Sequence, residues 1–432
     1  MPATRVAPAP IRLPALPRWK LRAARPSRGV IVLAGIGLVL GLPLGFLAGH
    51  KIGFDEGADH RRQSPNGSIL CKPGPWGDLS YIPFSIAAPD NLLPVRTLES
   101  IGTRWFFKGY TSDSFVSLLE STNLTQDQQH AFVAPDVFHL QTDGVLLTPP
   151  PALVISIPDG ARASLYQVLA RFQENEEQIY FIHKDTLDER FNGSGVSLDT
   201  LALFKRLSYP SGNYYLFSGL SALLSRLPTY QEKIQFVKAL TRQRTMLLRL
   251  HITPKTDVAA LTEYWGKGVW NTDVGTLLQS LTIIPTGTWM NILMVLPPLP
   301  TEEIYDYPTA VDNPLDGPPV NRDCHWTTLN FFRDVPDRNF GKPEYVLREL
   351  RENYALAPAD PRYGDVVLFS TPDGSIVHSA VYMADDICFT KNGATVISPW
   401  MLATVSDLVE QYSFMAPPGQ SLTVQYFRSK RL

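Results

Sequence analysis

The chain has 432 residues, of which 44% are hydrophobic and 11% aromatic, enough for two folded domains with additional segments. This composition excludes a globally disordered protein. The formal net charge is −2, but residues 1–29 hold seven Lys and Arg residues and no acid, which leaves 32 basic against 41 acidic residues, or about −9, on the rest. An acidic body excludes nucleic acid as the expected partner. Three cysteines, Cys71, Cys324 and Cys388, cannot form a disulfide framework and are compatible with one reactive thiol.

Residues 29–49 form an uncharged apolar run after a basic tail, residues 1–28. About twenty apolar residues suffice to cross a bilayer, so we expect a transmembrane anchor here. The basic tail before the run and Asp55 and Glu56 after it predict a cytoplasmic N-terminus and an extracytoplasmic body. The expected location is therefore the bacterial inner membrane, with a single pass. A cleaved secretion signal is the alternative, because small residues at 47–49 would permit processing.

Three glycines in this run, Gly37, Gly41 and Gly45, repeat at four-residue spacing. This spacing lets two membrane helices approach closely, so it predicts a dimer through the membrane segment. The alternative is that glycine is simply common in such segments.

Residues 50–90 are turn-rich and lack periodicity, which predicts a linker that contains Cys71. Residues 91–300 alternate apolar runs and capped helical patterns, which predicts one mixed α/β domain that positions substrate or binds a partner. The expected strands are 152–157, 178–183, 246–252 and 289–296, and the expected helices are 161–173, 198–208, 230–243 and 257–265. We find no nucleotide fingerprint, metal-ligand spacing or internal repeat, and therefore expect no cofactor and no metal.

A proline-rich connection over 297–319 leads into the last region, residues 301–432. Asp323 is a predicted helix N-cap, and Trp326 and Leu329 follow on one helical face. Cys324 therefore falls in the first helical turn, where free backbone N–H groups and the helix dipole favour a thiolate.

Three predicted strands follow this helix. The first covers 361–369, a turn at Asp373–Gly374 leads into the second over 375–383, and the third covers 387–392. The second strand carries His378. A cysteine at a helix start, then a histidine and an asparagine on successive strands, is the order of nucleophile, base and orienter in papain-like enzymes.

Three pieces of this region together resemble the NlpC-type family of papain-like cysteine peptidases. They are the pair Asp323–Cys324, the run Gly-Asp-Val-Val-Leu-Phe over 364–369, and His378 followed four residues later by Tyr382. The resemblance covers about 301–432 and implies a papain-like α+β domain. It also implies cleavage of amide bonds in peptidoglycan stem peptides. The expected fold class is thus α/β and α+β: a transmembrane helix, a mixed α/β middle domain and a papain-like C-terminal domain.

The sequence departs from the family at two places. The usual Ser-Gly after the cysteine is His325–Trp326, which makes the entrance to the nucleophile bulkier. The third catalytic residue of the family is a His, Asn or Gln on the strand after the base. Thr390 falls near that place by spacing, but a hydroxyl is a poor imidazole orienter, so we favour Asn392. Cys388, Thr390 and Asn392 share one face of their strand by alternation.

The resemblance also implies an active-site tyrosine before the cysteine, for which Tyr307 and then Tyr305 are the nearest matches. His325 is expected on the substrate side rather than as the base, because neighbouring helix positions point about 100° apart. Thr390 is expected on the substrate side together with His325.

The predicted function is a membrane-anchored cysteine peptidase or amidase with Cys324, His378 and Asn392 as catalytic residues. Two alternatives remain open. One is a papain-like deacylase or transamidase for another substrate, and the other is a non-catalytic envelope protein that binds wall peptides.

Overall fold

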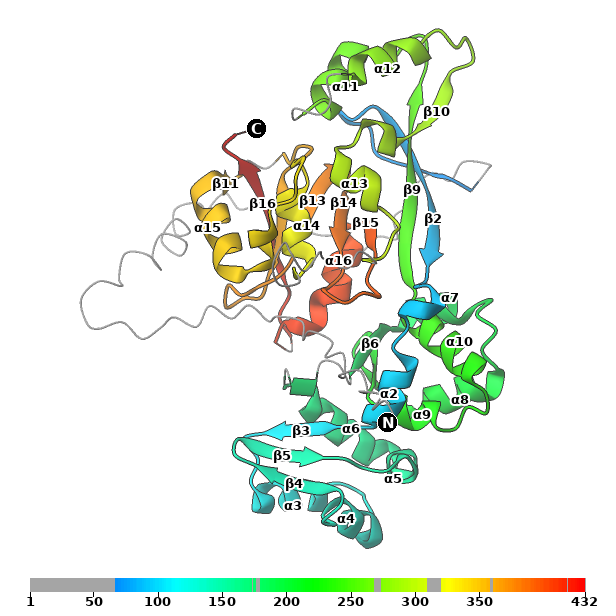
Figure 1. Cartoon of the computed structure of the whole chain (residues 1–432), viewed down its shortest axis with the longest axis vertical. Coiled ribbons are helices and arrows are strands. Elements are labelled where there is room, and N and C mark those ends of the chain that lie inside the picture. Colours follow the sequence, from blue (N-terminus) through cyan, green and yellow to red (C-terminus); the bar gives the residue numbers. More distant parts are fainter. Residues whose placement is uncertain are drawn as a thin grey trace, which may run out of the picture.

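The computed structural model describes residues 67–172, 174–175, 179–267, 273–308, 320–357, 360–417 and 419–431. These residues form a mixed α/β protein with four separate sheets (Figure 1). The predicted fold class is therefore corrected, because none of the described helices is long and apolar enough to cross a membrane. The predicted basic tail and membrane segment, residues 1–49 with Gly37, Gly41 and Gly45, lie outside the described residues.

The first sheet is a long antiparallel ribbon that extends beyond the rest of the molecule, and we call it the arm (Figure 1). Its strand order is β1-β2-β9-β10, with bounds Ile69–Leu70, Asp78–Ile86, Gln243–Ile252 and Thr288–Asn291. Two helices close one end, α11 (Val258–Trp265) and α12 (Val274–Leu281). The predicted linker over 50–90 thus includes β2, a central arm strand that pairs along its whole length with β9.

The part between β2 and β9 holds a structural duplication. The first repeat, residues 105–170, runs β3 (Trp105–Lys108), α3 (Ser112–Glu120), α4 (Gln126–Phe132), β4 (Phe138–Gln141), β5 (Gly144–Leu147), α5 (Pro151–Ser156) and α6 (Asp159–Leu169). The second repeat, residues 180–240, runs β6 (Tyr180–His183), α7 (Leu187–Phe191), α8 (Leu198–Leu207), β7 (Ser208–Ser211), β8 (Tyr214–Phe217), α9 (Leu220–Leu224) and α10 (Tyr230–Leu240). Each repeat forms a three-stranded sheet whose third strand lies in the middle, in the orders β3-β5-β4 and β6-β8-β7.

The strand register of the two repeats is the same. Trp105 pairs with Leu147 in the first, and Tyr180 pairs with Phe217 in the second. Leu147 and Phe217 are 70 residues apart, and so are Pro158 and Pro228, which precede the last helix of each repeat. The expectation that the chain has no internal repeat is therefore wrong. The two copies retain the spacing of apolar positions but few identical residues, so inspection of the sequence missed them.

Most predicted elements of this region are found, with two exceptions. The predicted strand over 152–157 is the helix α5, because Pro151 occupies its first turn, where proline suits a helix start. The predicted strand over 289–296 is only β10 followed by the 3-10 helix η4 (Ile292–Val295). A short apolar run without strict alternation does not by itself separate strand from helix.

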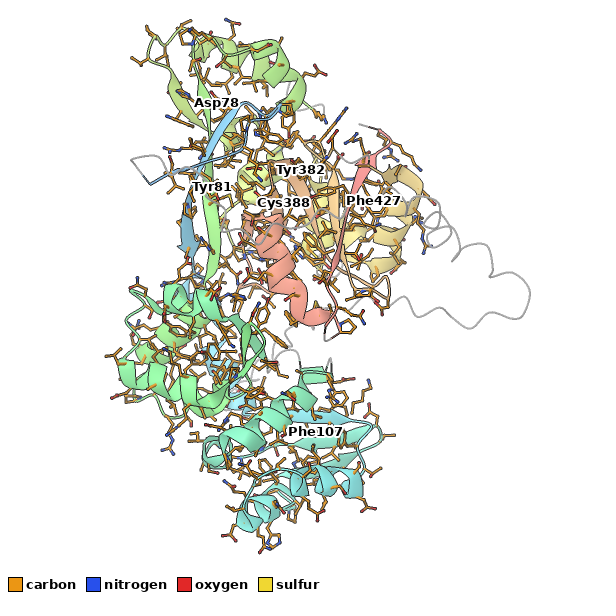
Figure 2. All side chains as sticks on the ribbon, turned by 180° about the vertical axis from the view of Figure 1, so that it is seen from behind. Asp78, Tyr81, Phe107, Tyr382, Cys388 and Phe427 are labelled. Carbon is orange, nitrogen blue, oxygen red and sulfur yellow. The ribbon has the colours of Figure 1, made fainter. Side chains whose placement is uncertain are left out.

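The C-terminal sheet is antiparallel, with the order β11-β16-β12-β13-β14-β15. The bounds are Tyr354–Leu356, Thr423–Ser429, Val366–Ser370, Ile376–Ala384, Ile387–Lys391 and Trp400–Thr404. Helices α14 (Cys324–Asn330) and α15 (Pro343–Asn353) contribute to the core on one face, together with Val381 and Phe389. Helix α16 (Val405–Tyr412) packs on the other face, against Ala380 and Cys388. Figure 2 shows Tyr382, Cys388 and Phe427 within this sheet and Phe107 in the distant first repeat.

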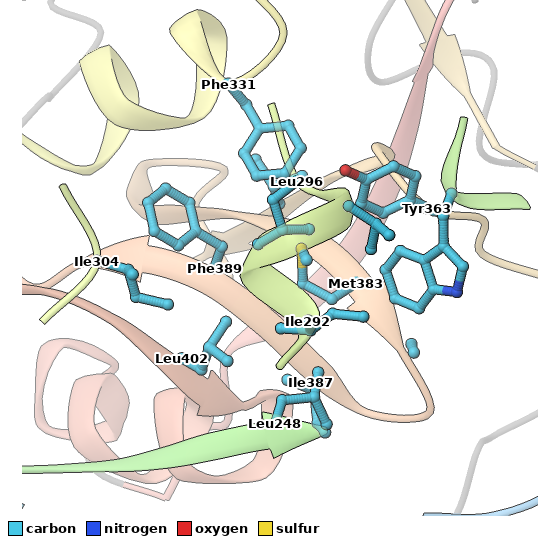
Figure 3. Packing of buried hydrophobic residues seen from close by; sticks show 14 of the residues in the cluster. Leu248, Ile292, Leu296, Ile304, Phe331, Tyr363, Met383, Ile387, Phe389 and Leu402 are labelled. Carbon is cyan, nitrogen blue, oxygen red and sulfur yellow. The ribbon is translucent and has the colours of Figure 1, made fainter. Parts of the chain in front are cut away.

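The arm and the C-terminal sheet share one hydrophobic core. Leu248 of β9 and Ile292 of η4 lie in the same cluster as Ile387, Phe389 and Leu402 of the sheet (Figure 3). Thr245 of β9 also forms two hydrogen bonds with strand β15. Its hydroxyl donates to the backbone carbonyl of Leu402 at 2.9 Å and accepts from the backbone N–H of Leu402 at 3.2 Å. Arm and sheet are therefore one packed unit.

We predict that Thr245→Val, which keeps the shape of the side chain, lowers the free energy of unfolding by about 1–3 kcal/mol, because both backbone groups of Leu402 lose a buried partner. Denaturant titration measures the change. Thr142→Val, at an exposed turn of the first repeat, is the matched control and is expected to change little. Equal effects of the two substitutions would contradict a role of Thr245 in joining arm and sheet.

Candidate active site

Cys324 is the first residue of α14, as the sequence predicted. The Asp323 side chain caps this helix and accepts hydrogen bonds from the backbone N–H groups of His325 and Trp326, each at 2.9 Å. The cap is 3% exposed and Cys324 is 6% exposed, so nucleophile and cap lie in a nearly dry environment. Burial raises the pKa of Asp323 to about 6, with the neighbouring Cys324 charge adding to the rise.

Two imidazoles, those of His325 and His378, influence the Cys324 thiol, and Nδ1 of His378 is buried without a hydrogen-bond partner among the described residues. Burial by itself would raise the pKa of Cys324, but the positive charges and hydrogen bonds of the two rings outweigh it and hold the pKa well below the ordinary thiol value. Burial likewise acts to lower the pKa of His325, yet the thiolate beside it raises that pKa to about 9. The arrangement therefore favours a thiolate next to an imidazolium.

His378 lies near the start of β13 and is fully buried. Its ring stacks on Tyr412 of α16, with centroids 4.3 Å apart and planes at 20°. Its Nε2 is 2.9 Å from Oγ1 of Thr390. The Thr390 hydroxyl donates its own hydrogen to the carbonyl of Ser379, so its oxygen is left to accept from an Nε2–H group. Thr390 thereby selects the tautomer that leaves the Nδ1 lone pair free for the thiol proton.

The structure does not bring Asn392 to His378. The Asn392 amide donates to Oε1 of Gln411 at 3.0 Å and contacts the Met401 sulfur, and no hydrogen bond joins it to His378 in the described part of the chain. The position expected for Asn392 beside the imidazole is held by Thr390. Two strand residues span about 6.6 Å, so Asn392 lies on the same face but too far along the strand.

Neither upstream tyrosine is placed beside the thiol. The Tyr305 hydroxyl donates to the carbonyl of Met246 in the arm, at 2.6 Å. Tyr307 packs in the core of the second repeat. The tyrosine of the site is Tyr412, whose pKa is raised well above its ordinary value by burial and then by the negative charges of Cys324 and Asp323. Sequence reasoning missed Tyr412 because it lies 88 positions after Cys324, with no motif around it.

The side chain of His325 is fixed against strand β13. Its Nδ1 lies 2.8 Å from Oγ of Ser379, and that hydroxyl donates to Oγ1 of Thr328 at 3.2 Å. Because the Ser379 hydrogen is committed to Thr328, Nδ1 of His325 is the donor in this contact, and the ring also interacts with Cys324. His325 lines the cavity beside Cys324 and also interacts with it, so both neighbouring residues of the helix contribute to one cluster.

A buried lysine also belongs to this neighbourhood. Lys391 is fully buried on β14, and its Nζ donates to the carbonyls of Gly393 and Thr395. Burial lowers the pKa of Lys391 to about 7, although the charges of Asp323 and Cys324 oppose the shift. Nothing in the sequence marked Lys391 as buried.

Cys324 opens onto a cavity of about 330 Å³ between the C-terminal sheet and the two repeats. The C-terminal part supplies Asp323, Cys324 and His325, together with Tyr412 and Phe414. The opposite wall comes from residues next to and within the second repeat, among them Ile179, Phe181 and Arg190. The thiol therefore has a route to a ligand. The described residues contain no cluster of three or more His, Cys, Asp or Glu side chains that could hold a metal ion.

Comparison of the chain with protein-family models, with curated proteins and with solved structures finds no match to any of them.

We predict that Cys324 reacts with iodoacetamide as a thiolate down to pH values well below 8.5, the ordinary midpoint for cysteine. Its low pKa preserves the reactive form as the pH falls. Peptide mass spectrometry of a pH series separates it from Cys388, which is fully buried and whose pKa is raised by burial. His378→Ala and His325→Gln should each move the Cys324 midpoint upward. A wild-type midpoint between 8 and 9 would sink the thiolate assignment.

We predict that Thr390→Val slows Cys324 alkylation at pH 6 to 7 by about tenfold, because the loss of one buried hydrogen bond to the imidazole is worth about 1.4 kcal/mol. Asn392→Ala serves as the matched control on the same strand face and should leave the rate within about twofold. The reverse order of the two effects would restore Asn392 as the orienter. Melting curves of both variants show whether the fold is retained.

Proposed function

We propose that the protein is a cysteine hydrolase of amide bonds, with Cys324 as nucleophile and His378 as general base. The observation that carries the proposal is the Cys324 thiol, whose pKa is held low by two imidazoles and which opens onto a cavity large enough for a substrate group. A structural cysteine such as Cys388 has the opposite environment, a dry apolar core that raises its pKa.

The reaction runs through an acyl-enzyme. Nδ1 of His378 takes the thiol proton, and the Cys324 sulfur attacks the amide carbonyl to form a carbon–sulfur bond. The imidazolium returns its proton to the nitrogen as the carbon–nitrogen bond breaks, and the amine leaves. Water then attacks the thioester, giving its proton to His378, and the carbon–sulfur bond breaks to release the carboxylic acid. The sulfur leaves as a thiolate beside the protonated His378, which restores the starting pair.

The surrounding residues support these steps as positioning groups. Thr390 holds the His378 tautomer and Tyr412 holds the ring plane by stacking. The capped start of α14 presents the Cys324 backbone N–H toward the oxygen that becomes negative in the tetrahedral intermediate. His325 keeps a second positive charge beside the sulfur, which stabilises the thiolate before attack.

The substrate class follows from the resemblance to the NlpC-type family, which favours peptides of the peptidoglycan stem. A second candidate has an observation of its own: the cavity wall is rich in apolar side chains, including Phe172, Phe181, Ile397, Phe414 and Met415. An apolar wall suits the acyl group of an N-acylated substrate, so deacylation is the alternative reaction on the same thiol.

The test is incubation of the purified protein with peptidoglycan fragments and, separately, with N-acyl amino acids of increasing chain length. Mass spectrometry of the products is expected to show amide cleavage by the wild type and none by Cys324→Ala. Cleaved wall peptides support the peptidase, and released acyl chains support the deacylase. Equal results for wild type and Cys324→Ala in both series contradict the hydrolase proposal and leave a peptide-binding protein.

A further inference from the structure

The wall of the cavity opposite Cys324 is formed largely by the second repeat and by the segment before it. This wall is fixed to the C-terminal part by specific contacts. Phe181 of β6 stacks on Phe414 with centroids 3.9 Å apart and planes at 11°. The Tyr214 hydroxyl of the β7–β8 hairpin meets the Ser413 hydroxyl at 2.8 Å. The second repeat is therefore held in place as part of the candidate site.

Arg190, on the short helix α7, is the cation of this wall. Its Nη1 donates to the carbonyls of Leu240 and Arg242 at 3.0 and 2.9 Å, which fixes the guanidinium at the cavity. Its Nε lies 3.4 Å from the Thr186 hydroxyl. No hydrogen bond in the described part of the chain uses Nη2, and Nη2 is absent from the buried atoms that lack a partner. The Nη2 edge of the guanidinium is thus left for a ligand.

The nearest acid on the same helix does not neutralise Arg190 by direct contact. Glu189 accepts a hydrogen bond from Ser85 and lies 3.9 Å from Nε of Arg244, so its carboxylate is directed to the arm. Burial lowers the pKa of Arg190 to about 10, and the charge of Glu189 offsets this only in part. A guanidinium whose other partners are neutral carbonyls is stabilised most by an anion that accepts from its remaining Nη2 hydrogens.

We infer that this cavity binds substrates that carry a free carboxylate beside an apolar group, with Arg190 as the carboxylate-binding residue and Phe181 and Phe414 as the apolar contact. The inference rests on the proposed function, because it assigns the substrate class of the same site. It places specificity in the second repeat, outside the part that carries the thiol and the imidazole. The two hydrogens of Nη2 are the donors left for the carboxylate, and a hydrogen bond between two ionised groups is roughly twice as strong as one between neutral groups.

The test uses protection of Cys324 from iodoacetamide, which needs no knowledge of the natural substrate. The probes are N-acetyl-L-phenylalanine, which has an aromatic ring and a carboxylate, and N-acetyl-L-phenylalaninamide, which lacks only the charge. We expect the acid to protect wild-type Cys324 at a concentration at least about tenfold lower than the amide, as a charged hydrogen bond is worth roughly 1.5–3 kcal/mol.

Arg190→Met keeps the length of the side chain and removes its charge, and it should abolish the difference between the two probes. Arg190→Lys, which keeps the charge, should retain part of it. Arg226→Met removes an exposed arginine of the same repeat and is the matched control, expected to behave as wild type.

Three outcomes separate the possibilities. Equal protection by acid and amide in the wild type overturns the inference, and so does a preference for the acid that survives Arg190→Met. Slow labelling of unprotected Cys324, or a labelling midpoint at the ordinary pKa of cysteine, instead contradicts the proposed function itself. Protection in each variant is expressed relative to the unprotected labelling rate of that same variant, which distinguishes loss of binding from a change in the thiolate.

Discussion

The site depends on one physical constraint, the stabilisation of a negative sulfur in a place almost without water. Burial alone would keep Cys324 protonated, as it does Cys388 on strand β14. Two imidazoles reverse that outcome, and each must be held in one tautomer and one orientation. Ser379 serves both: its side chain fixes His325, and its backbone carbonyl takes the Thr390 hydrogen that orients His378. Strand β13 is thus the common support of both rings.

The pKa shifts of the buried groups also make the stability of the folded protein depend on pH, and His325 and Lys391 contribute with opposite signs. The folded-state pKa of His325 is about 9, above its unfolded value near 6.5, so the folded protein binds more protons and loses stability as the pH rises through that window. Lys391 has a folded-state pKa of about 7 against 10.5 unfolded, so stability rises with pH across its window. Cys324, whose folded-state pKa is held well below its ordinary value, binds fewer protons in the folded protein and so offsets the contribution of His325. The contribution of Lys391 is left over, so the stability of the folded protein is expected to rise with pH above about pH 7.

Local signals in the sequence were sufficient for part of the site. Asp323 before an apolar helical pattern predicted the cap, and alternating apolar residues predicted the strands that carry His378 and Thr390. The role of Thr390 was not readable, because its hydroxyl is a good orienter only when a carbonyl from the neighbouring strand takes its hydrogen. That carbonyl belongs to Ser379, and its register is fixed by tertiary structure. Tyr412 and Arg190 arrive from distant elements for the same reason.

The second wall of the candidate site comes mainly from one copy of the duplication in the middle region. Both repeats keep the same strand register and the same helix order, so their cores tolerate extensive change at fixed apolar spacing. The second repeat contacts the C-terminal part through Phe181 and His183 of β6 and Tyr214 of β8. The corresponding hairpin of the first repeat carries Leu140, which is 62% exposed. The duplication therefore places one copy against the candidate site and leaves the corresponding hairpin of the other copy exposed.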